Sequence, residues 1–373
     1  ITIPETSSSD GRPRSRRREM LDLNRVATDF YREKLNGPDG ADARAYLQGR
    51  GISDEIAEAF QLGYAPDDWG QLSDHLRSLG QSSEVAQDVG LVVPKKSGRG
   101  FYDRFRDRLM CPIILPGGEV VGFSGRLVHD SGDKAAAKYI NSPESPIYKK
   151  SKLLFGLHLA REGFRQRNRA ILVEGNFDVI TLHQAGFPET IAPLGTALTP
   201  EQVGQLRRLT DEVVLLYDGD RAGRMAAYKA LLSLVAVDLE VKIVVLADGE
   251  DPDSAVKNKG SKYLEELVAQ ARPALEYFIY DVWTKDGGGS AHRRARALDA
   301  AAKLLGNIGN PTKRDLISGT LASALGIDVA VVRRAIKRPG SQEAGSRARD
   351  DRYGPPPNDR FGPGPDQDYG PPT

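Results

Sequence analysis

The chain has 373 residues, 39% of them hydrophobic, and a formal net charge of +1 at pH 7. This length predicts two or three domains with ample material for a core, and the balanced charge provides no global basic field that would attract nucleic acid. The single cysteine, Cys111, excludes a disulfide framework and a multi-cysteine zinc site within the chain. A single cysteine suits a reducing cytoplasm. No apolar run approaches the roughly 20 residues needed for a membrane span.

Residues 1–20 are polar and end in a run of arginines, which predicts a disordered basic segment. The segment lacks the apolar centre of a signal peptide, and without an initial methionine we expect a fragment of a longer protein. Apolar residues then recur at helical spacing over 20–35. Further helices are predicted over 42–50 and 55–60, the last with Ser53 as its N-cap.

Residues 91–152 have a different character, with short strands predicted at 91–94, 109–115 and 119–128. The last two strands are separated by a predicted turn at 116–118.

The same stretch is locally basic, because twelve Lys and Arg residues stand against six Asp and Glu. Aromatic residues lie between these charges, a combination typical of sites for single-stranded nucleic acid or a run of phosphates. Arg104, Arg106 and Arg108 alternate in sequence, so we expect them to share one face of a strand. The alternative is a solvated strand face without a ligand.

Residues 169–249 alternate between buried strands and helices, which predicts a parallel sheet covered by helices. The predicted strands are 170–174, 190–195, 213–217 and 241–246, and the predicted helices are 178–184, 200–209 with Thr199 as N-cap, and 222–237. Residues 262–337 are predicted to be helical, over 262–283, 291–305, 312–325 and 328–337. The remainder is rich in Pro and Gly and is expected to be a flexible linker.

Carboxylates follow three of the predicted strands at their carboxyl ends, where open α/β sheets place ligand sites. They are Glu174, Asp178, Asp218, Asp220, Asp251 and Asp253. Clustered carboxylates repel one another and need a cation, and an all-oxygen set suits Mg²⁺ or Mn²⁺ rather than zinc. Such a site favours metal-assisted phosphoryl transfer. The alternative is that these residues only cap helices and form turns.

The motifs EGNFD, LGTALT, YDGDRAGRMAA and DGEDPDS resemble the Toprim module of bacterial DnaG-type primases, whose first motif is commonly EGYMD. Asn176 and Phe177 depart from that pattern at uncharged positions. YDRFRDRLMCPI, GFSGR, KYINSPESPIYKKSKLLFGL and the early AYLQGRGIS resemble the amino-terminal half of the primase polymerase core. The resemblance covers about residues 22–338.

This resemblance implies that Glu174, Asp218 and Asp220 are catalytic and bind metal, with Glu174 as a metal ligand or general base. Asp251 is implied as a further metal ligand, and Asp178 and Asp253 as supporting acids of the same metal set. It also implies a basic ridge that holds template and incoming nucleotide. The ridge residues are Arg126, Lys138, Asn141 and Lys150, with Arg104 and Arg106 in the same cleft.

The implied fold class is α/β, with a Toprim-type parallel sheet flanked by helices, a mixed α/β subdomain before it and a small helical bundle after it. The expected domains are a disordered basic segment (1–20), an N-terminal α/β subdomain with the basic ridge (21–150), a Toprim metal-binding domain (151–272), a helical subdomain (273–338) and a Pro/Gly-rich linker (339–373).

We therefore expect a DNA primase catalytic core, a nucleotidyltransferase that makes short RNA primers from NTPs on single-stranded DNA with Mg²⁺ or Mn²⁺. Expected partners are the template, NTPs and the RNA primer–DNA hybrid, at the bacterial cytoplasmic replisome and without a membrane. The family's zinc-binding domain and its domain for a DnaB-type replicative helicase are expected to lie outside this chain. The alternatives are a Toprim-type phosphodiester-cleaving enzyme, similar to nucleases and topoisomerases, and a non-catalytic binding module.

Overall fold

The computed structural model describes residues 11–96, 98, 100–129, 137–195, 197–286 and 290–336. Within these residues the chain divides into two compact units, one up to Lys150 and one from Leu159 onward. Between them, Ser151–Leu154 belong to the second unit and Phe155–His158 to the first. The expected linker at 339–373 lies outside the described residues.

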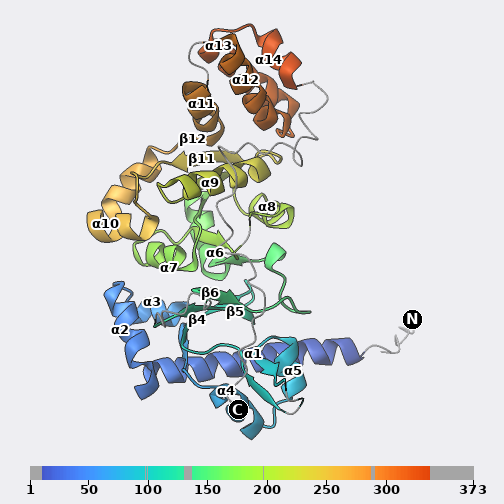
Figure 1. Cartoon of the computed structure of the whole chain (residues 1–373), viewed down its shortest axis with the longest axis vertical. Coiled ribbons are helices and arrows are strands. Elements are labelled where there is room, and N and C mark those ends of the chain that lie inside the picture. Colours follow the sequence, from blue (N-terminus) through green and yellow to red (C-terminus); the bar gives the residue numbers. More distant parts are fainter. Residues whose placement is uncertain are drawn as a thin grey trace, which may run out of the picture. The chain divides into compact units, whose positions relative to one another are not determined.

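A long helix, α1, is the main helix of the first unit (Figure 1). It spans Gly11–Asn36 and so begins inside the segment that we expected to be disordered. Met20 and Leu23 are buried, which gives the early turns of this helix an apolar contact with the core. The shorter helices of this unit are η1 (Pro38–Gly40), α2 (Ala41–Gly49), α3 (Asp54–Ala59), α4 (Gln71–Ser78) and α5 (Ser83–Asp88).

The first unit contains a four-stranded antiparallel sheet in the order β1-β4-β5-β6. The strands are β1 (Gly63–Ala65), β4 (Arg108–Ile114), β5 (Val120–Leu127) and β6 (Tyr139–Asn141), and a separate antiparallel pair is formed by β2 (Val92–Pro94) and β3 (Phe101–Asp103). The turn predicted between β4 and β5 is confirmed, with Gly118 at φ 93°. On one face of the sheet, Phe123 packs edge to face against Tyr31 of α1, with 5.6 Å between ring centroids.

The prediction that Arg104, Arg106 and Arg108 share a strand face is wrong. β3 ends at Asp103 and β4 begins at Arg108, and between them the chain bends at Asp107, whose φ is +48°. That bend interrupts the alternation of a strand. Arg108 is only 7% exposed and donates hydrogen bonds to the carbonyl oxygens of Gly125, at 3.0 Å, and Ala137, at 2.9 Å.

The second unit is organised around a six-stranded sheet in the order β12-β11-β10-β8-β9-β7. The strands are β7 (Leu154–Phe155), β8 (Arg169–Leu172), β9 (Thr190–Pro193), β10 (Glu212–Leu216), β11 (Glu240–Val244) and β12 (Arg272–Pro273). Neighbours from β9 to β11 are parallel, and β12 is antiparallel to β11. The predicted parallel sheet is therefore confirmed.

The helices between these strands complete the expected βαβ pattern. They are α6 (Leu157–Arg167), α7 (Asn176–Gln184), α8 (Pro200–Leu206), α9 (Arg221–Leu234) and α10 (Pro252–Ala269). Thr199 is the N-cap of α8, as predicted, and forms a capping box with Gln202. After β8 the chain first adds β9 on one side and later β10 on the other, so the sheet has its topological switch point between β8 and β10.

The described chain ends in four helices, α11 (Ala274–Asp286), α12 (Ala291–Gly306), α13 (Pro311–Leu325) and α14 (Val329–Ile336). The last three agree closely with prediction, but the single helix predicted over 262–283 is wrong. Strand β12 separates α10 from α11 there, because Pro273 has no backbone N–H and restricts Arg272 to an extended conformation.

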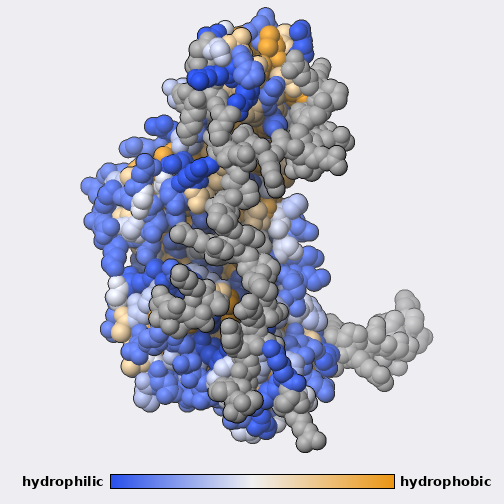
Figure 2. All heavy atoms as spheres, viewed as in Figure 1, coloured by the Kyte–Doolittle hydropathy of each residue, from blue (hydrophilic) through white to orange (hydrophobic). Residues whose placement is uncertain are grey.

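The coloured residues in the view of Figure 2 are mainly hydrophilic, with hydrophobic residues over α13 and α14. Leu316 and Val331 are exposed large apolar residues of these helices. Among the described residues, no helix combines the length and the apolar composition that crossing a bilayer requires.

Candidate functional site

Glu174 lies just after β8, at the carboxyl edge of the parallel sheet. Its side chain is partly buried, and its Oε1 atom has no hydrogen-bond partner among the described residues. Burial, followed by the negative charges of Asp218 and Asp220, raises the pKa of Glu174 to about 7. The carboxyl group therefore lies close to the two aspartates of the neighbouring strand.

Asp218 and Asp220 follow β10, on the other side of the switch point. Asp220 is the N-cap of α9, and its Oδ1 accepts a hydrogen bond from the Gly223 amide at 2.8 Å. Gly223 packs so closely on this loop that a Cβ atom there would lie 2.3 Å from the carbonyl oxygen of Asp218. The start of α9 thus fixes the position of both aspartates.

The remaining acids lie at the starts of α7 and α10. Asp251 is the N-cap of α10 and accepts a hydrogen bond from the Ser254 amide at 2.6 Å. Asp253 accepts one from the Thr181 hydroxyl of α7 at 2.8 Å. Asp178 accepts one from the Gly175 amide at 3.0 Å, and burial, followed by the charges of Asp218 and Asp251, raises its pKa well above the usual range.

The structure therefore brings the six predicted carboxylates to one edge of the sheet, and two of them, Asp220 and Asp251, are also helix N-caps. Among the described residues, no three His, Cys, Asp or Glu side chains converge in the arrangement of a metal-ligand group. The chemistry of the donors nevertheless fits a divalent cation. All donors are carboxylate oxygens, which Mg²⁺ and Mn²⁺ prefer, and Glu174 Oε1 is a buried oxygen that finds no hydrogen-bond partner in the described part of the chain.

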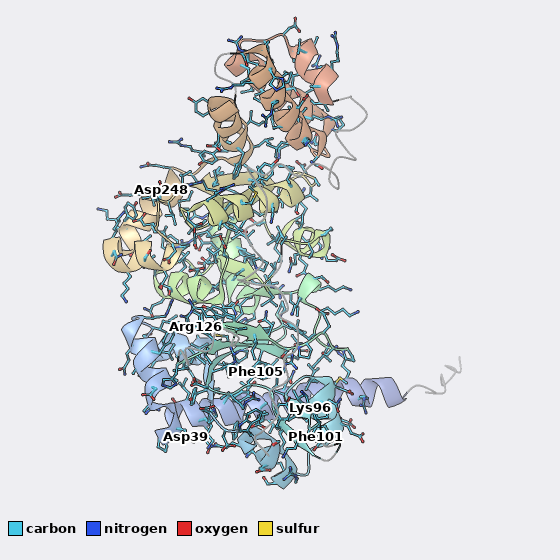
Figure 3. The ribbon with its side chains drawn as sticks, in the orientation of Figure 1. Asp39, Lys96, Phe101, Phe105, Arg126 and Asp248 are labelled. Atoms are coloured by element: carbon cyan, nitrogen blue, oxygen red, sulfur yellow. The ribbon has the colours of Figure 1, made fainter. Side chains whose placement is uncertain are left out.

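Two tyrosine side chains and a second arginine lie around Arg126 of the first unit, whose position Figure 3 marks. The Arg126 guanidinium carbon lies 4.9 Å from the ring centroid of Tyr46 on α2 and 5.1 Å from that of Tyr139 on β6. Arg126 also donates a hydrogen bond to the Tyr139 hydroxyl. Arg50 Nε donates to the Tyr46 hydroxyl at 2.5 Å. Two guanidinium groups are thus held by aromatic side chains.

The other predicted ridge residues lie on and after the same pair of strands. Asn141 on β6 lies opposite Ser124 on β5, so these two side chains share one face of the sheet. Arg126 is two residues after Ser124 on the same strand and therefore projects from that face too. Lys138 is exposed immediately before β6. Lys150 begins a short 3-10 helix, and its backbone amide donates to Glu144 at 3.0 Å.

Arg104 and Arg106 lie in the bend between β3 and β4. Arg106 stacks on Trp69, with its guanidinium carbon 4.0 Å from the ring centroid, and it donates to the Asp103 carbonyl. Arg104 is partly buried, and its backbone amide donates to the Leu91 carbonyl at 2.9 Å.

Sequence reasoning did not select Tyr46, Arg50 or Trp69. Tyr46 and Arg50 are four residues apart, a spacing that places them on one helix face, so AYLQGR contained a usable signal. Trp69 has no such local signal, because its contact with Arg106 depends on the tertiary fold.

Three protein-family models match the chain in order. The model described as "DNA primase catalytic core, N-terminal domain" matches residues 30–161, and that described as "Toprim domain" matches 168–247. The model described as "DnaB-helicase binding domain of primase" matches 288–330. The last match corrects our expectation that the helicase-binding domain lies outside this chain, because the matched residues include α12 and α13.

Curated relatives and solved structures agree with these models. The chain is 37% identical over 308 residues to the DNA primase of Synechococcus elongatus, covering 80% of this chain and 44% of that protein. It is 35% identical over 371 residues to the DNA primase of Mycolicibacterium smegmatis, covering 95% and 58%. The chain thus spans about half the length of the curated relatives it matches.

Among solved structures, a DNA primase domain from Pseudomonas aeruginosa is 34% identical, with a TM-score of 0.78 and coverage of 86% of this chain and 100% of that one. The DnaG primase catalytic domain bound to ssDNA is 33% identical, with a TM-score of 0.74 and coverage of 85% and 99%. These similarities do not favour the phosphodiester-cleaving alternative.

Proposed function

Because this chain belongs to the family of DnaG-type primase catalytic cores, we propose that it is a DNA-directed RNA polymerase. It makes short RNA primers from NTPs on a single-stranded DNA template, for DNA replication. The observation that carries this proposal is the set of carboxylates beside the switch point of a sheet that matches the Toprim model. Open α/β sheets bind their ligands at this edge.

We assign Glu174, Asp218, Asp220 and Asp251 as the residues that would hold Mg²⁺ or Mn²⁺, with Asp178 and Asp253 in support. Such a cation supplies positive charge for the triphosphate and increases the acidity of the attacking 3′-hydroxyl. The alternative role for Glu174 is to accept a proton instead of binding the cation, and in the metal-free protein burial and the charges of Asp218 and Asp220 raise its pKa to about 7.

The basic residues of the first unit bind the charged partners in this proposal. Arg126, Lys138, Asn141 and Lys150 hold the incoming NTP and the primer–template hybrid, and Arg104 and Arg106 contact the single strand. Arginine side chains suit phosphate because their planar groups donate paired hydrogen bonds. The segment 288–330 is proposed to dock a DnaB-type replicative helicase at the bacterial replisome, as its family model suggests.

The test is primer synthesis on single-stranded DNA with NTPs and Mg²⁺ or Mn²⁺. Asp218→Asn should reduce synthesis by roughly 100-fold or more, because it removes one of the carboxylate charges that would hold the cation, and the cation would stabilise the charge of the transferring phosphate. Asp238→Asn is the matched control, since Asp238 is exposed before β11 at the opposite edge of the sheet. Full activity in Asp218→Asn would overturn the site assignment. Nicking of DNA without NTPs would instead support phosphodiester cleavage.

A further inference from the structure

Two acidic loops at the carboxyl edge of the second sheet are joined by a backbone hydrogen bond. The β10 loop is defined as residues 218–220 and the β11 loop as residues 247–251. The amide of Gly219 in the β10 loop donates to the carbonyl oxygen of Glu250 in the β11 loop at 2.8 Å. A Cβ atom at Gly219 would lie 1.9 Å from the carbonyl oxygen of Ala247, so the close approach requires glycine.

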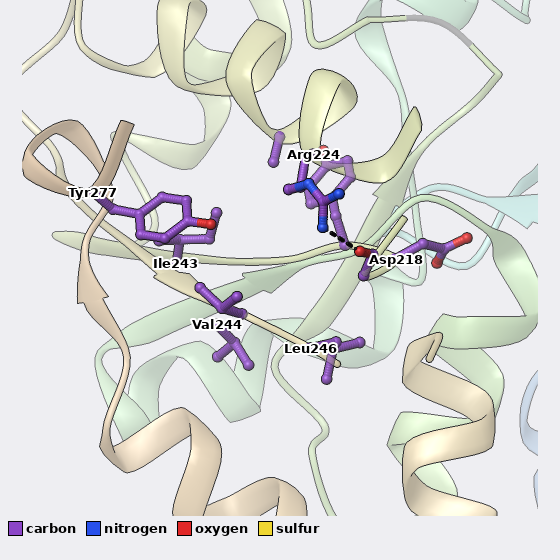
Figure 4. A pocket seen from close by; sticks show the side chains of 10 residues that line it. Asp218, Arg224, Ile243, Val244, Leu246 and Tyr277 are labelled. Carbon is purple, nitrogen blue, oxygen red and sulfur yellow. Dashed lines mark hydrogen bonds between the residues drawn. The ribbon is translucent and has the colours of Figure 1, made fainter. Parts of the chain in front are cut away.

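Arg224 connects the same two loops through its side chain. Its Nη1 atom donates to the carbonyl oxygen of Gly219 (Figure 4) and also to Oδ1 of Asp248, the latter at 3.1 Å. Its backbone amide donates to the carbonyl oxygen of Asp220 at 3.1 Å. One residue in the first turn of α9 therefore contacts both loops.

The β11 loop is itself held in a fixed shape. The Glu250 amide donates to the Ala247 carbonyl at 3.0 Å, and the Ala247 amide donates to the Glu250 carboxylate at 3.3 Å. Lys259 of α10 pairs with the same carboxylate. A side chain that holds this loop in place therefore also restricts the position of Asp251, which follows Glu250 directly.

Apolar side chains cover one side of the Arg224 contact. Ile243, Val244, Leu246 and Tyr277 line, with Arg224 and Asp218, a cavity of about 10 Å³ (Figure 4). Apolar surroundings strengthen the hydrogen bond to Gly219. The Asp248 carboxylate is 88% exposed, so that ion pair adds little energy by itself. The contribution of Arg224 thus lies mainly in holding the two loops together.

We propose that Arg224 is a positioning residue that holds Asp218 and Asp220 at a fixed distance from Asp251 against their mutual repulsion. The consequence for metal binding rests on the proposed function, whereas the joining of the loops does not. Without Arg224 the β10 and β11 loops separate more often, and the carboxylates must be brought together when a cation binds. The affinity for the cation then falls.

The experiment compares the whole chain with Arg224→Ala, Arg224→Lys and the control Arg207→Ala. Arg207 forms an equivalent exposed Arg–Asp pair, with Asp211, at the other edge of the sheet. Amide hydrogen exchange is first measured without metal. Arg224→Ala should accelerate exchange in residues 218–220 and 247–251, while Arg207→Ala leaves these residues unchanged. Unchanged exchange in Arg224→Ala would overturn the proposal.

Binding of Mn²⁺ alone is then measured by calorimetry, without NTP or template. Arg224→Ala should raise the dissociation constant about tenfold, as is typical when a residue that orients metal ligands is removed. Arg224→Lys keeps the charge and one donor and should restore part of the affinity. Faster exchange with an unchanged dissociation constant would overturn the positioning role. Failure of the unaltered chain to bind Mn²⁺ would instead contradict the proposed function, and the exchange result would still decide whether Arg224 joins the loops.

Asp248→Ala provides a second variant if Arg224→Ala does not fold. It removes only one of the two side-chain hydrogen bonds of Arg224. Exchange in residues 247–251 should increase, by less than in Arg224→Ala. Exchange equal to that of the unaltered chain would count against the proposal.

Discussion

Arg126 and Tyr139 lie opposite each other on β5 and β6, and the Arg126 guanidinium donates a hydrogen bond to the Tyr139 hydroxyl. The ring of Tyr139 lies 5.1 Å from the guanidinium carbon, and Tyr46 approaches the same group from α2. Stacking and hydrogen bonding together restrict the orientation of the arginine. In the proposed function, that orientation prepares Arg126 to bind phosphate.

Tyr139→Phe should therefore raise the KM for NTP about fivefold with little change in kcat, because a hydrogen bond is worth about 1 kcal/mol. Tyr46→Ala should have a larger effect, since it also removes a cation–π contact. Steady-state primer synthesis checks both variants, with Tyr280→Phe as the control because Tyr280 is an exposed residue of α11. A fall in kcat alone would argue against a role in binding.

The pKa of Glu174 predicts how the metal-free protein responds to pH. The folded protein raises this pKa to about 7, above the ordinary value of 4.5. The group is neutral in both states below pH 4.5, and its ionisation destabilises the fold as the pH rises from about 4.5 to about 7. Glu174→Gln removes that penalty.

Glu174→Gln should thus increase the free energy of unfolding of the metal-free protein above pH 7, by on the order of 1 to 3 kcal/mol, while abolishing primer synthesis. Urea unfolding at pH 5 and pH 8 in a chelator measures the effect. The exposed Glu265→Gln serves as the control. Equal stability changes at the two pH values would contradict the assigned cause.

Local signals predicted the second unit well. Ile171, Leu172 and Val173 are consecutive buried aliphatics, as are Val213–Leu216, so strands buried on both faces were recognisable from sequence. Helix caps such as Thr199 were recognisable too, because capping depends on residues within one turn. The carboxylates at the strand ends followed directly from these strands.

Contacts between distant segments were harder to predict. Tyr46 and Arg126 lie on different elements, and only the folded chain brings them together. The buried position of Arg108 depends on carbonyl groups of β5 and of the segment before β6, which its own sequence neighbourhood does not reveal. β12 is two residues long and exists because it pairs with β11, so no periodicity indicated it.

His129 connects three segments of the first unit and should make its stability dependent on pH. Its Nδ1 lies 2.8 Å from Asp107 Oδ1, and its Nε2 lies 3.1 Å from Asp42 Oδ2 on α2. The hydrogen bond to Asp107, followed by the other contributions of Asp107 and Asp42, raises the pKa of His129. The protonated form is therefore favoured in the folded state.

The resulting stabilisation is fully present below pH 6.5 and is lost as the pH rises through the raised pKa. Because the imidazole is half exposed, we expect a contribution below about 1 kcal/mol. His129→Ala should lower the melting temperature at pH 6 and have a smaller effect at pH 9. His292→Ala, at an exposed position of α12, is the control. A larger effect of His129→Ala at pH 9 would contradict this prediction.

Two glycines in helices of the second unit allow a matched comparison. Gly204 in α8 has open space around it, whereas a Cβ atom at Gly223 in α9 would lie 2.3 Å from the Asp218 carbonyl oxygen. Alanine is the better helix former by about 1 kcal/mol, so Gly204→Ala should stabilise the protein slightly and leave primer synthesis unchanged. Gly223→Ala should instead destabilise the protein and reduce primer synthesis. The clash of its Cβ atom with the Asp218 carbonyl costs more than the gain in helix propensity, and it displaces Asp218. Both predictions are checked by measuring the melting temperature and the primer synthesis of each variant. A stabilised and fully active Gly223→Ala would show that the close packing of α9 does not position Asp218.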